Sequence, residues 1–156
     1  MSVTPRPRRE AILALAFFVA VTVALTWPQA ARLGSASADL LDAKLSAWIL
    51  HWDYEQTLRD PLALFQAPIL YPAKYVLAFS ENMYGAALFG FPLLAAGASL
   101  LANYNAVLLL GMCLSAWSAW LLARYVTGDA IASLVAGLIY GFLPYKISQL
   151  AHFHMQ

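Results

Sequence analysis

Carboxylates are the side chains of this 156-residue chain with the clearest capacity for chemistry, and most of them share one stretch. Six of the eight acidic residues lie between residues 28 and 84, namely Asp39, Asp42, Asp53, Glu55, Asp60 and Glu81. A carboxylate held close to a hydroxyl group can take its proton as a general base. Near the start of a helix the same group can serve only as a cap and a partner of the helix dipole. From the residues alone, both interpretations of Asp39 and Asp42 stay open.

The apolar residues around these acids predict a helix over residues 39–58. They recur every three or four positions, at Leu41, Leu45, Trp48 and Trp52, which is the spacing of one helical face. A tryptophan-rich face beside a membrane favours a helix lying flat in the interface. Asp42, Asp53 and Glu55 fall outside this stripe, so we expect them to face water. Glu81 directly precedes an apolar run, and we expect it to face protein or a water-filled cavity because a glutamate facing lipid is costly.

The composition points to a membrane as the surroundings of these elements. Of all residues, 62% are hydrophobic and 11% are charged, whereas soluble domains carry about 25% charged residues. Residues 11–27 form an uncharged run after Arg6, Arg8 and Arg9, and residues 82–123 are also free of charge. We expect hydrophobic helices over 11–27, 85–102, 106–123 and 130–143, with a break at Asn103–Asn105. Gly137 and Gly141 lie one helical turn apart and predict close packing against another helix.

The sequence therefore predicts an all-α membrane protein with about four hydrophobic helices. A large first extracytoplasmic loop, 28–84, would hold the interfacial helix, and the basic N-terminus, 1–10, would be cytoplasmic. We expect the polar tail, 144–156, to be truncated. Counting four passes places residues 124–129 outside, although Arg124 favours the cytoplasm. The conflict disappears if 85–102 is re-entrant or broken, as its three glycines and its proline allow.

Several other readings carry less weight. The basic N-terminus and Ala36-Ser37-Ala38 resemble a signal peptide with its cleavage site, but that site lies well beyond the apolar core. No basic stripe suggests nucleic acid as a partner. The single cysteine, Cys113, excludes a disulfide within the chain and is interpreted as a packing residue. His152 and His154 alone are too few to predict a metal site, so no metal ligand is assigned.

A set of motifs in a fixed order resembles one group of membrane enzymes. The motifs are Asp42-Ala-Lys-Leu-Ser-Ala-Trp48-Ile-Leu-His-Trp52, Pro68-Ile-Leu-Tyr-Pro72, Ser80-Glu-Asn-Met-Tyr-Gly85, Pro144-Tyr-Lys146 and His152-Phe-His154. Over residues 20–156 the chain resembles the N-terminal part of bacterial multi-pass proteins of the GT-C glycosyltransferase superfamily. These are related to the protein mannosyltransferases and the aminoarabinose transferases.

The resemblance implies transfer of a sugar from a polyprenyl-phosphate carrier to an extracytoplasmic acceptor at a bacterial cytoplasmic (inner) membrane. It implies Asp42 as the catalytic general base and Glu81 as a second catalytic acid. The candidate substrate-binding residues are Asp39, Lys44, Trp48, Lys146, His152 and His154. Arg32, Lys44, Lys74 or Lys146 would neutralise the phosphate. No cofactor is assigned, although some relatives use a divalent metal. Members of the group are much longer, so we expect this chain to be a fragment.

Two alternatives belong to other functional classes. In a structural membrane protein, Asp42 and Glu81 would be only caps and interface charges. A transporter element would carry ionisable residues inside its spans, and the uncharged stretch 82–123 argues against it.

Overall fold

The described part of the chain is built from helices. The structure, a computed structural model, describes residues 8–36, 42–79 and 81–148. These residues form helices and loops and contain no β-strand. The prediction of an all-α chain is confirmed to that extent. Asp39, His152 and His154 lie outside the described residues.

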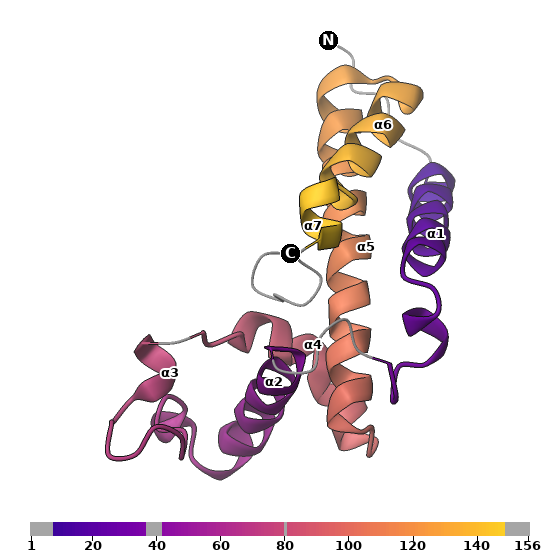
Figure 1. Cartoon of the computed structure of the whole chain (residues 1–156). Coiled ribbons are helices and arrows are strands. Elements are labelled where there is room, and N and C mark those ends of the chain that lie inside the picture. Colours follow the sequence, from indigo (N-terminus) through magenta and orange to yellow (C-terminus); the bar gives the residue numbers. More distant parts are fainter. Residues whose placement is uncertain (1–7, 37–41, 80, 149–156) are drawn as a thin grey trace.

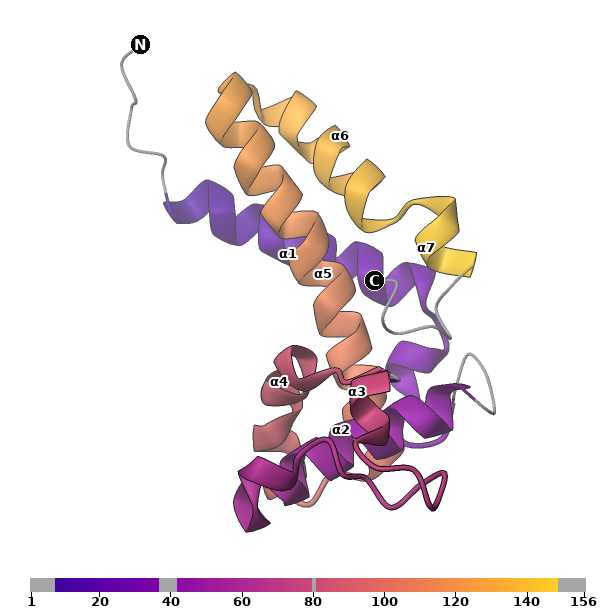
Figure 2. The same ribbon diagram turned by 90° about the vertical axis from the view of Figure 1, so that its left-hand side faces the viewer.

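One long helix, α5 (Leu100–Thr127), is the element on which the others pack. Figure 1 shows α1 (Arg8–Leu25) and α6 (Ala130–Gly141) beside one half of α5, with the short α7 (Pro144–Ser148) continuing from α6. Around the other half lie α2 (Asp42–Arg59), α4 (Tyr84–Ala95) and the short α3 (Val76–Phe79), which Figure 2 shows from the side. Two single-turn 3₁₀ helices, η1 (Gln29–Ala31) and η2 (Pro61–Ala63), lie in the connections.

Two separate apolar cores result, one around each half of α5. The first joins α2, α3, α4 and the start of α5, and its members include Ala47, Leu50, Leu77, Ala87, Tyr104 and Leu108. The second joins α1, α6 and the later part of α5, with Ala14, Phe18, Cys113, Ala116 and Trp120. We call the first group of helices the α2–α4 layer. Among the described elements only α5 contributes residues to both cores, so it fixes how the cores stand relative to each other.

The boundaries of α5 and α6 follow from side-chain caps. Ser99 Oγ accepts from the Ala102 amide at 3.2 Å, and Asp129 Oδ1 accepts from the Ala132 amide at 2.7 Å. Such caps satisfy amides that the first helical turn leaves unpaired. Gly128 ends α5 with a φ of +71°, a conformation that glycine adopts without strain. The chain therefore reverses within two residues, and α6 runs back along α5.

The break expected at Asn103–Asn105 is wrong, because α5 continues through it. Asparagine disfavours helix interiors when its amide bonds to its own backbone. Here the Asn105 amide instead bonds to Leu33 and Ala36, about 70 positions away in the sequence. The chain turns earlier, at Gly97, which has a φ of +85°. The element expected at 85–102 is thus replaced by a helix of 12 residues, Tyr84–Ala95, followed by a turn.

Within the described residues, two helical units are long and apolar enough to cross a membrane, α5 and the stretch Ala130–Ser148 that combines α6 and α7. Only 33% and 22% of their apolar windows are buried, unlike the core helix of a soluble protein. α1 opens with three charged residues, Arg8, Arg9 and Glu10. α4 is about 18 Å long, too short for a hydrocarbon layer of about 30 Å. Four spanning helices are therefore not established.

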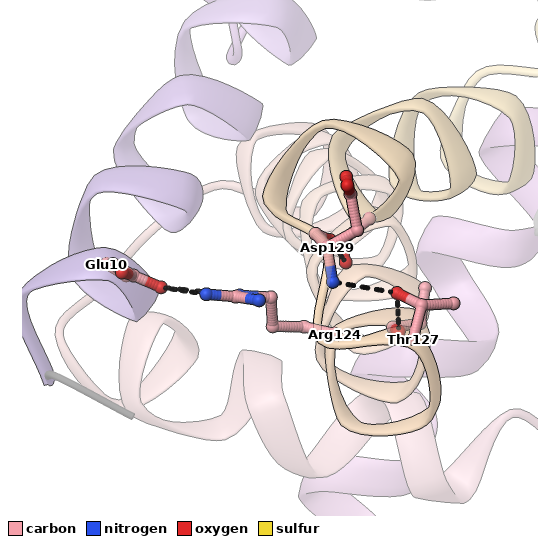
Figure 3. Close-up of polar contacts among 6 residues, drawn as sticks. Glu10, Arg124, Thr127 and Asp129 are labelled. Carbon is pink, nitrogen blue, oxygen red and sulfur yellow. Dashed lines mark hydrogen bonds and ion pairs between the residues drawn. The ribbon is translucent and has the colours of Figure 1, made fainter. Parts of the chain in front are cut away.

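An ion pair joins the start of α1 to the end of α5. Arg124 Nη2 lies 2.9 Å from Glu10 Oε2, and Arg124 Nε also donates to that oxygen, at 3.3 Å. Figure 3 shows the pair beside the turn in which the Asp129 amide donates to Thr127 Oγ1. Arg8 and Arg9 directly precede Glu10, so the basic residues of both helices gather at one end of the molecule. Residues 124–129 thus lie on the side of the start of α1, as Arg124 favoured.

The predicted close packing at Gly137 and Gly141 is confirmed. A Cβ atom at Gly137 would lie 2.8 Å from the Ala116 carbonyl oxygen, and one at Gly141 would lie 2.9 Å from Ala116 Cα. These distances are well inside van der Waals contact, and backbone atoms cannot move aside easily. The two glycines therefore set the approach of α6 to α5, as small residues do in membrane helix pairs.

Replacing Gly141 by leucine should separate α6 from α5. We expect Gly141→Leu to lower the free energy of unfolding by about 1–3 kcal/mol, the usual cost of overpacking. The measurement is thermal unfolding in detergent, followed by tryptophan fluorescence. Gly111→Leu is the matched control, because a Cβ at Gly111 in α5 meets no atom within 4 Å. Equal midpoints for the two variants would contradict the role assigned to Gly141.

Candidate functional site

The two predicted catalytic acids lie in the α2–α4 layer, in different elements. Asp42 is the first residue of α2 and is exposed. It lies in the first helical turn, where a negatively charged side chain interacts favourably with the helix dipole. Glu81 is also exposed and lies in the segment that leads from α3 into α4. Both carboxylates are therefore on the surface of the layer.

Two of the candidate substrate-binding residues belong to the same helix as Asp42. Lys44 is exposed, whereas Trp48 is partly buried. The rings of Trp48 and Trp52 stack with centroids 5.8 Å apart and an interplanar angle of 20°. Trp52 Nε1 donates to the Leu64 carbonyl oxygen at 2.8 Å. This tryptophan pair thus joins α2 to the segment that follows it. The helix face expected to lie flat in the interface involved no such contact with the rest of the chain.

Lys146 lies elsewhere, among the helices beside the second core. Its ammonium donates to Ser115 Oγ of α5 at 2.8 Å and lies 4.6 Å from the centre of the Tyr140 ring. The side chain is buried, with 8% of its surface exposed. Lys146 therefore belongs to the α5–α6–α7 packing and is not grouped with Asp42 in α2.

The acid that the structure encloses is Asp53, which we expected to face water. That expectation is wrong, because the residue is fully buried on the face of α2 that also carries Ala43, Ala47 and Leu50. Its Oδ1 accepts from Asn82 Nδ2 at 3.0 Å, whereas its Oδ2 has no hydrogen-bond partner. Burial raises the pKa of Asp53 to about 6, partly offset by the hydrogen bond from Asn82. Desolvation outweighs the single hydrogen bond because it acts on the whole carboxylate.

Asn82 and Thr57 connect Asp53 to the start of α4. Asn82 Oδ1 accepts from the Tyr84 amide at 3.1 Å while its amide group bonds Asp53. Thr57 Oγ1 donates to the Asp53 carbonyl oxygen and lies 3.2 Å from the Tyr84 hydroxyl. One face of α2 is thereby bonded to the entry of α4, directly after Glu81. The position of Glu81 thus depends on the Asp53–Asn82 contact.

Unpaired buried polar atoms of the described residues gather in this layer. They are Asp53 Oδ2, His51 Nδ1 and both amide atoms of Asn103. The Asn103 amide packs against Gly90 of α4, where a Cβ would lie 2.6 Å from Asn103 Oδ1. A buried polar group without a partner costs about 1–3 kcal/mol. Strain, a catalytic role or bound water can each account for such unpaired groups, and among the described residues none of these groups belongs to the second core.

The acidic loop was found from the sequence, but its buried polar contacts were missed. One signal was present, since Ala43, Ala47, Leu50 and Asp53 are spaced by four, three and three residues. Small residues at that spacing indicate a face packed closely on other helices, and Asp53 continues that face. The larger tryptophans drew attention to the other side of α2. No local signal marks Asn82 as the partner of Asp53, because the two residues are 29 positions apart and the pairing depends on the path of the chain between them.

No group of three or more histidine, cysteine, aspartate or glutamate side chains within 8–36, 42–79 and 81–148 is arranged to hold a metal ion. Comparison with protein-family models, with curated proteins and with solved structures gave no match. The geometry of the α2–α4 layer and the order of its motifs therefore carry the functional argument.

The raised pKa of Asp53 predicts a pH-dependent stability. A carboxyl whose folded-state pKa of about 6 exceeds its ordinary value of 3.8 destabilises the fold when ionised, and protonation as the pH falls through 6 relieves this. We expect this group to make the chain about 1 kcal/mol more stable at pH 5 than at pH 7.5. Asp53→Asn should remove that difference, measured by thermal unfolding in detergent at both pH values.

The exposed acid Glu55, on the same helix, supplies the control. Its side chain is 65% exposed and lies 3.3 Å from His51 Nε2. Glu55→Gln should keep the difference between pH 5 and pH 7.5 that Asp53→Asn loses. A wild-type chain that is less stable at pH 5, with both variants following it, would contradict the assignment.

Proposed function

We propose that the chain is the N-terminal portion of a GT-C-type glycosyltransferase. It would transfer a sugar from a polyprenyl-phosphate carrier to an acceptor on the side of the α2–α4 layer. The observation that carries the proposal is the place of Asp42, exposed at the first turn of α2 and remote from the Glu10–Arg124 end. The order of motifs from Asp42 to His154 supports the same family.

The basic residues suggest which side of the membrane this layer occupies. Arg8, Arg9 and Arg124 gather at one end of the helices, and basic residues favour the cytoplasmic side. The α2–α4 layer would then face the outside of a bacterial cytoplasmic membrane. This orientation suits a carrier lipid whose phosphate lies at the outer interface, within reach of an acceptor outside the cell.

In the proposed reaction, Asp42 takes the proton of an acceptor hydroxyl group. The acceptor oxygen then forms a bond to the anomeric carbon of the sugar. The bond from that carbon to the carrier phosphate breaks, and the phosphate oxygen leaves with the electron pair. A general base of this kind contributes about 10²–10⁴-fold to the rate.

The developing charge on the phosphate requires a cation near Asp42. Lys44 is two residues away and exposed, so an ammonium group is present on the same turn of α2. Lys146 is less suited to this task, because its ammonium is engaged with Ser115 and the Tyr140 ring. The donor lipid, the acceptor and the surrounding bilayer are the partners that the proposal requires.

Replacing Asp42 by asparagine tests the proposal in the complete protein as encoded. Asp42→Asn keeps the size of the side chain and removes the base, so transfer from a radiolabelled polyprenyl-phosphate sugar should fall at least about 100-fold. Glu55→Gln, at an exposed acid of the same helix, should transfer normally. Transfer by Asp42→Asn at the wild-type rate, with equal protein in the membrane, would reject Asp42 as the base.

A transport function is a second candidate because of Lys146. This lysine lies within the apolar unit Ala130–Ser148 and contacts α5 at Ser115. The uncharged stretch 82–123, which argued against transport from the sequence, does not include this lysine. Ionisable residues at such positions commonly belong to ion or substrate pathways. If the complete protein moved a solute into proteoliposomes without transferring sugar, and Lys146→Gln abolished that flux, transport would replace the glycosyltransferase proposal.

A further inference from the structure

The segment from Leu58 to Phe79 has one packed side and one strongly apolar exposed side. Ala67, Val76 and Leu77 are buried in the first core, and the Leu77 amide donates to the Phe65 carbonyl oxygen at 3.3 Å. Seven large apolar side chains of the same segment are exposed, namely Leu58, Leu62, Phe65, Leu70, Tyr71, Tyr75 and Phe79. Leu62, Tyr71 and Phe79 expose 94%, 95% and 88% of their surfaces. An apolar surface of this kind marks a contact with lipid or another molecule.

The charges of this 58–79 segment are few and mainly basic. Arg59 and Lys74 are exposed, and Asp60 is the single acid. Asp60 Oδ1 accepts from the Leu62 amide and so caps η2. Exposed aromatic and leucine side chains flanked by lysine and arginine are the composition of segments that lie in a membrane interface. Anionic headgroups would meet the two cations there.

The position of the 58–79 segment along the axis of α5 agrees with a location at the membrane interface. Asn103 and Arg124 are 21 residues apart in one continuous helix, so they are separated by about 32 Å along its axis. The hydrocarbon layer is about 30 Å thick. With Arg124 at one membrane surface, the other surface falls near Tyr104, which is a member of the first core. Figure 1 shows α3 projecting sideways from α5 in this layer.

Trp48 and Trp52, which the sequence analysis placed at the membrane interface, instead make contacts within the α2–α4 layer. Trp48 stacks on Trp52, and Trp52 bonds to the Leu64 carbonyl. That bond fixes the 58–79 segment to α2 by its inner side. The outer side of the 58–79 segment is therefore better suited to contact the membrane interface than the tryptophan face of α2.

We propose that the 58–79 segment lies in the lipid headgroup layer on the side of the α2–α4 layer, with Leu62, Tyr71 and Phe79 inserted toward the acyl chains. The occupant of this apolar surface is the bilayer itself. The inference does not depend on glycosyl transfer, since it rests on exposure, charge and level along α5. Its effect is to hold α2, and with it Asp42, at a fixed height above the membrane.

Spin labels at single cysteines test the proposal. In a Cys113→Ser background, labels are placed at Leu62, Tyr71 and Phe79 in separate variants of the whole chain. Each is reconstituted in nanodiscs of phosphatidylcholine with one part in about three of phosphatidylglycerol, a composition that supplies anionic headgroups. Ile139→Cys, on the exposed face of α6, is the lipid reference, and Glu55→Cys, at an exposed charge of α2, is the water reference. Collision with oxygen and with a water-soluble nickel complex measures the depth of each label.

We expect the three labels to be about 5–10 Å below the headgroup boundary, the usual depth of interfacial side chains, so that they collide with oxygen more than the label at Glu55 does. Labels that collide with nickel as freely as the label at Glu55 would show a segment in water and overturn the proposal. Labels shielded from both reagents would show that protein covers the surface, and would overturn it too. Equal size-exclusion profiles of all variants establish that the cysteines leave the fold intact.

Discussion

The carboxamide of Asn105 determines how the two halves of this molecule are joined. Its oxygen accepts from Gln29 Nε2 at 2.7 Å, and its nitrogen donates to the carbonyls of Leu33 and Ala36 at 2.6 and 2.7 Å. The side chain is fully buried, so each bond is made away from water, where an unmade one is costly. These bonds fix the chain after α1 to the first turns of α5. The end of the stretch 8–36 is thereby held against α5.

The α2–α4 layer is packed differently from the helices around the second core. Around the second core, small and apolar groups meet closely, as Gly137 does with Phe18 and Ala116. In the layer, polar groups are enclosed with some of their hydrogen-bonding capacity unused, and Asp53 is the clearest case. Such burial costs stability and persists where other contacts determine the geometry. The difference distinguishes the helices around the second core from the layer on which function is proposed to depend.

The sequence predicted features that depend on neighbours along one helix. The spacing around Asp42 indicated a helix, and Gly137 with Gly141 indicated close packing, and both are present. It failed where partners come from distant segments. Asn105 suggested a break because its bonds to residues 29–36 could not be foreseen, and Asp53 suggested a water-facing side because Asn82 was not known to reach it. Which face of α2 is packed also depends on α4 and α5. The sequence of α2 alone, with tryptophans on one side and alanines on the other, is compatible with burial of either side.

The ion pair between Glu10 and Arg124 has a consequence for how the chain is made. The ribosome completes Glu10 long before it reaches Arg124, 114 positions later. During that interval α1 has neither this partner nor α6 beside it. In the orientation proposed above, the residues of the acidic loop would cross to the far side ahead of α5. Acidic residues have little influence on orientation, so the arginines beside Glu10 must hold the nascent chain in place. In that orientation Arg124 would reach Glu10 only when α5 is complete, and the ion pair would join α1 to α5 on the side where the chain is made.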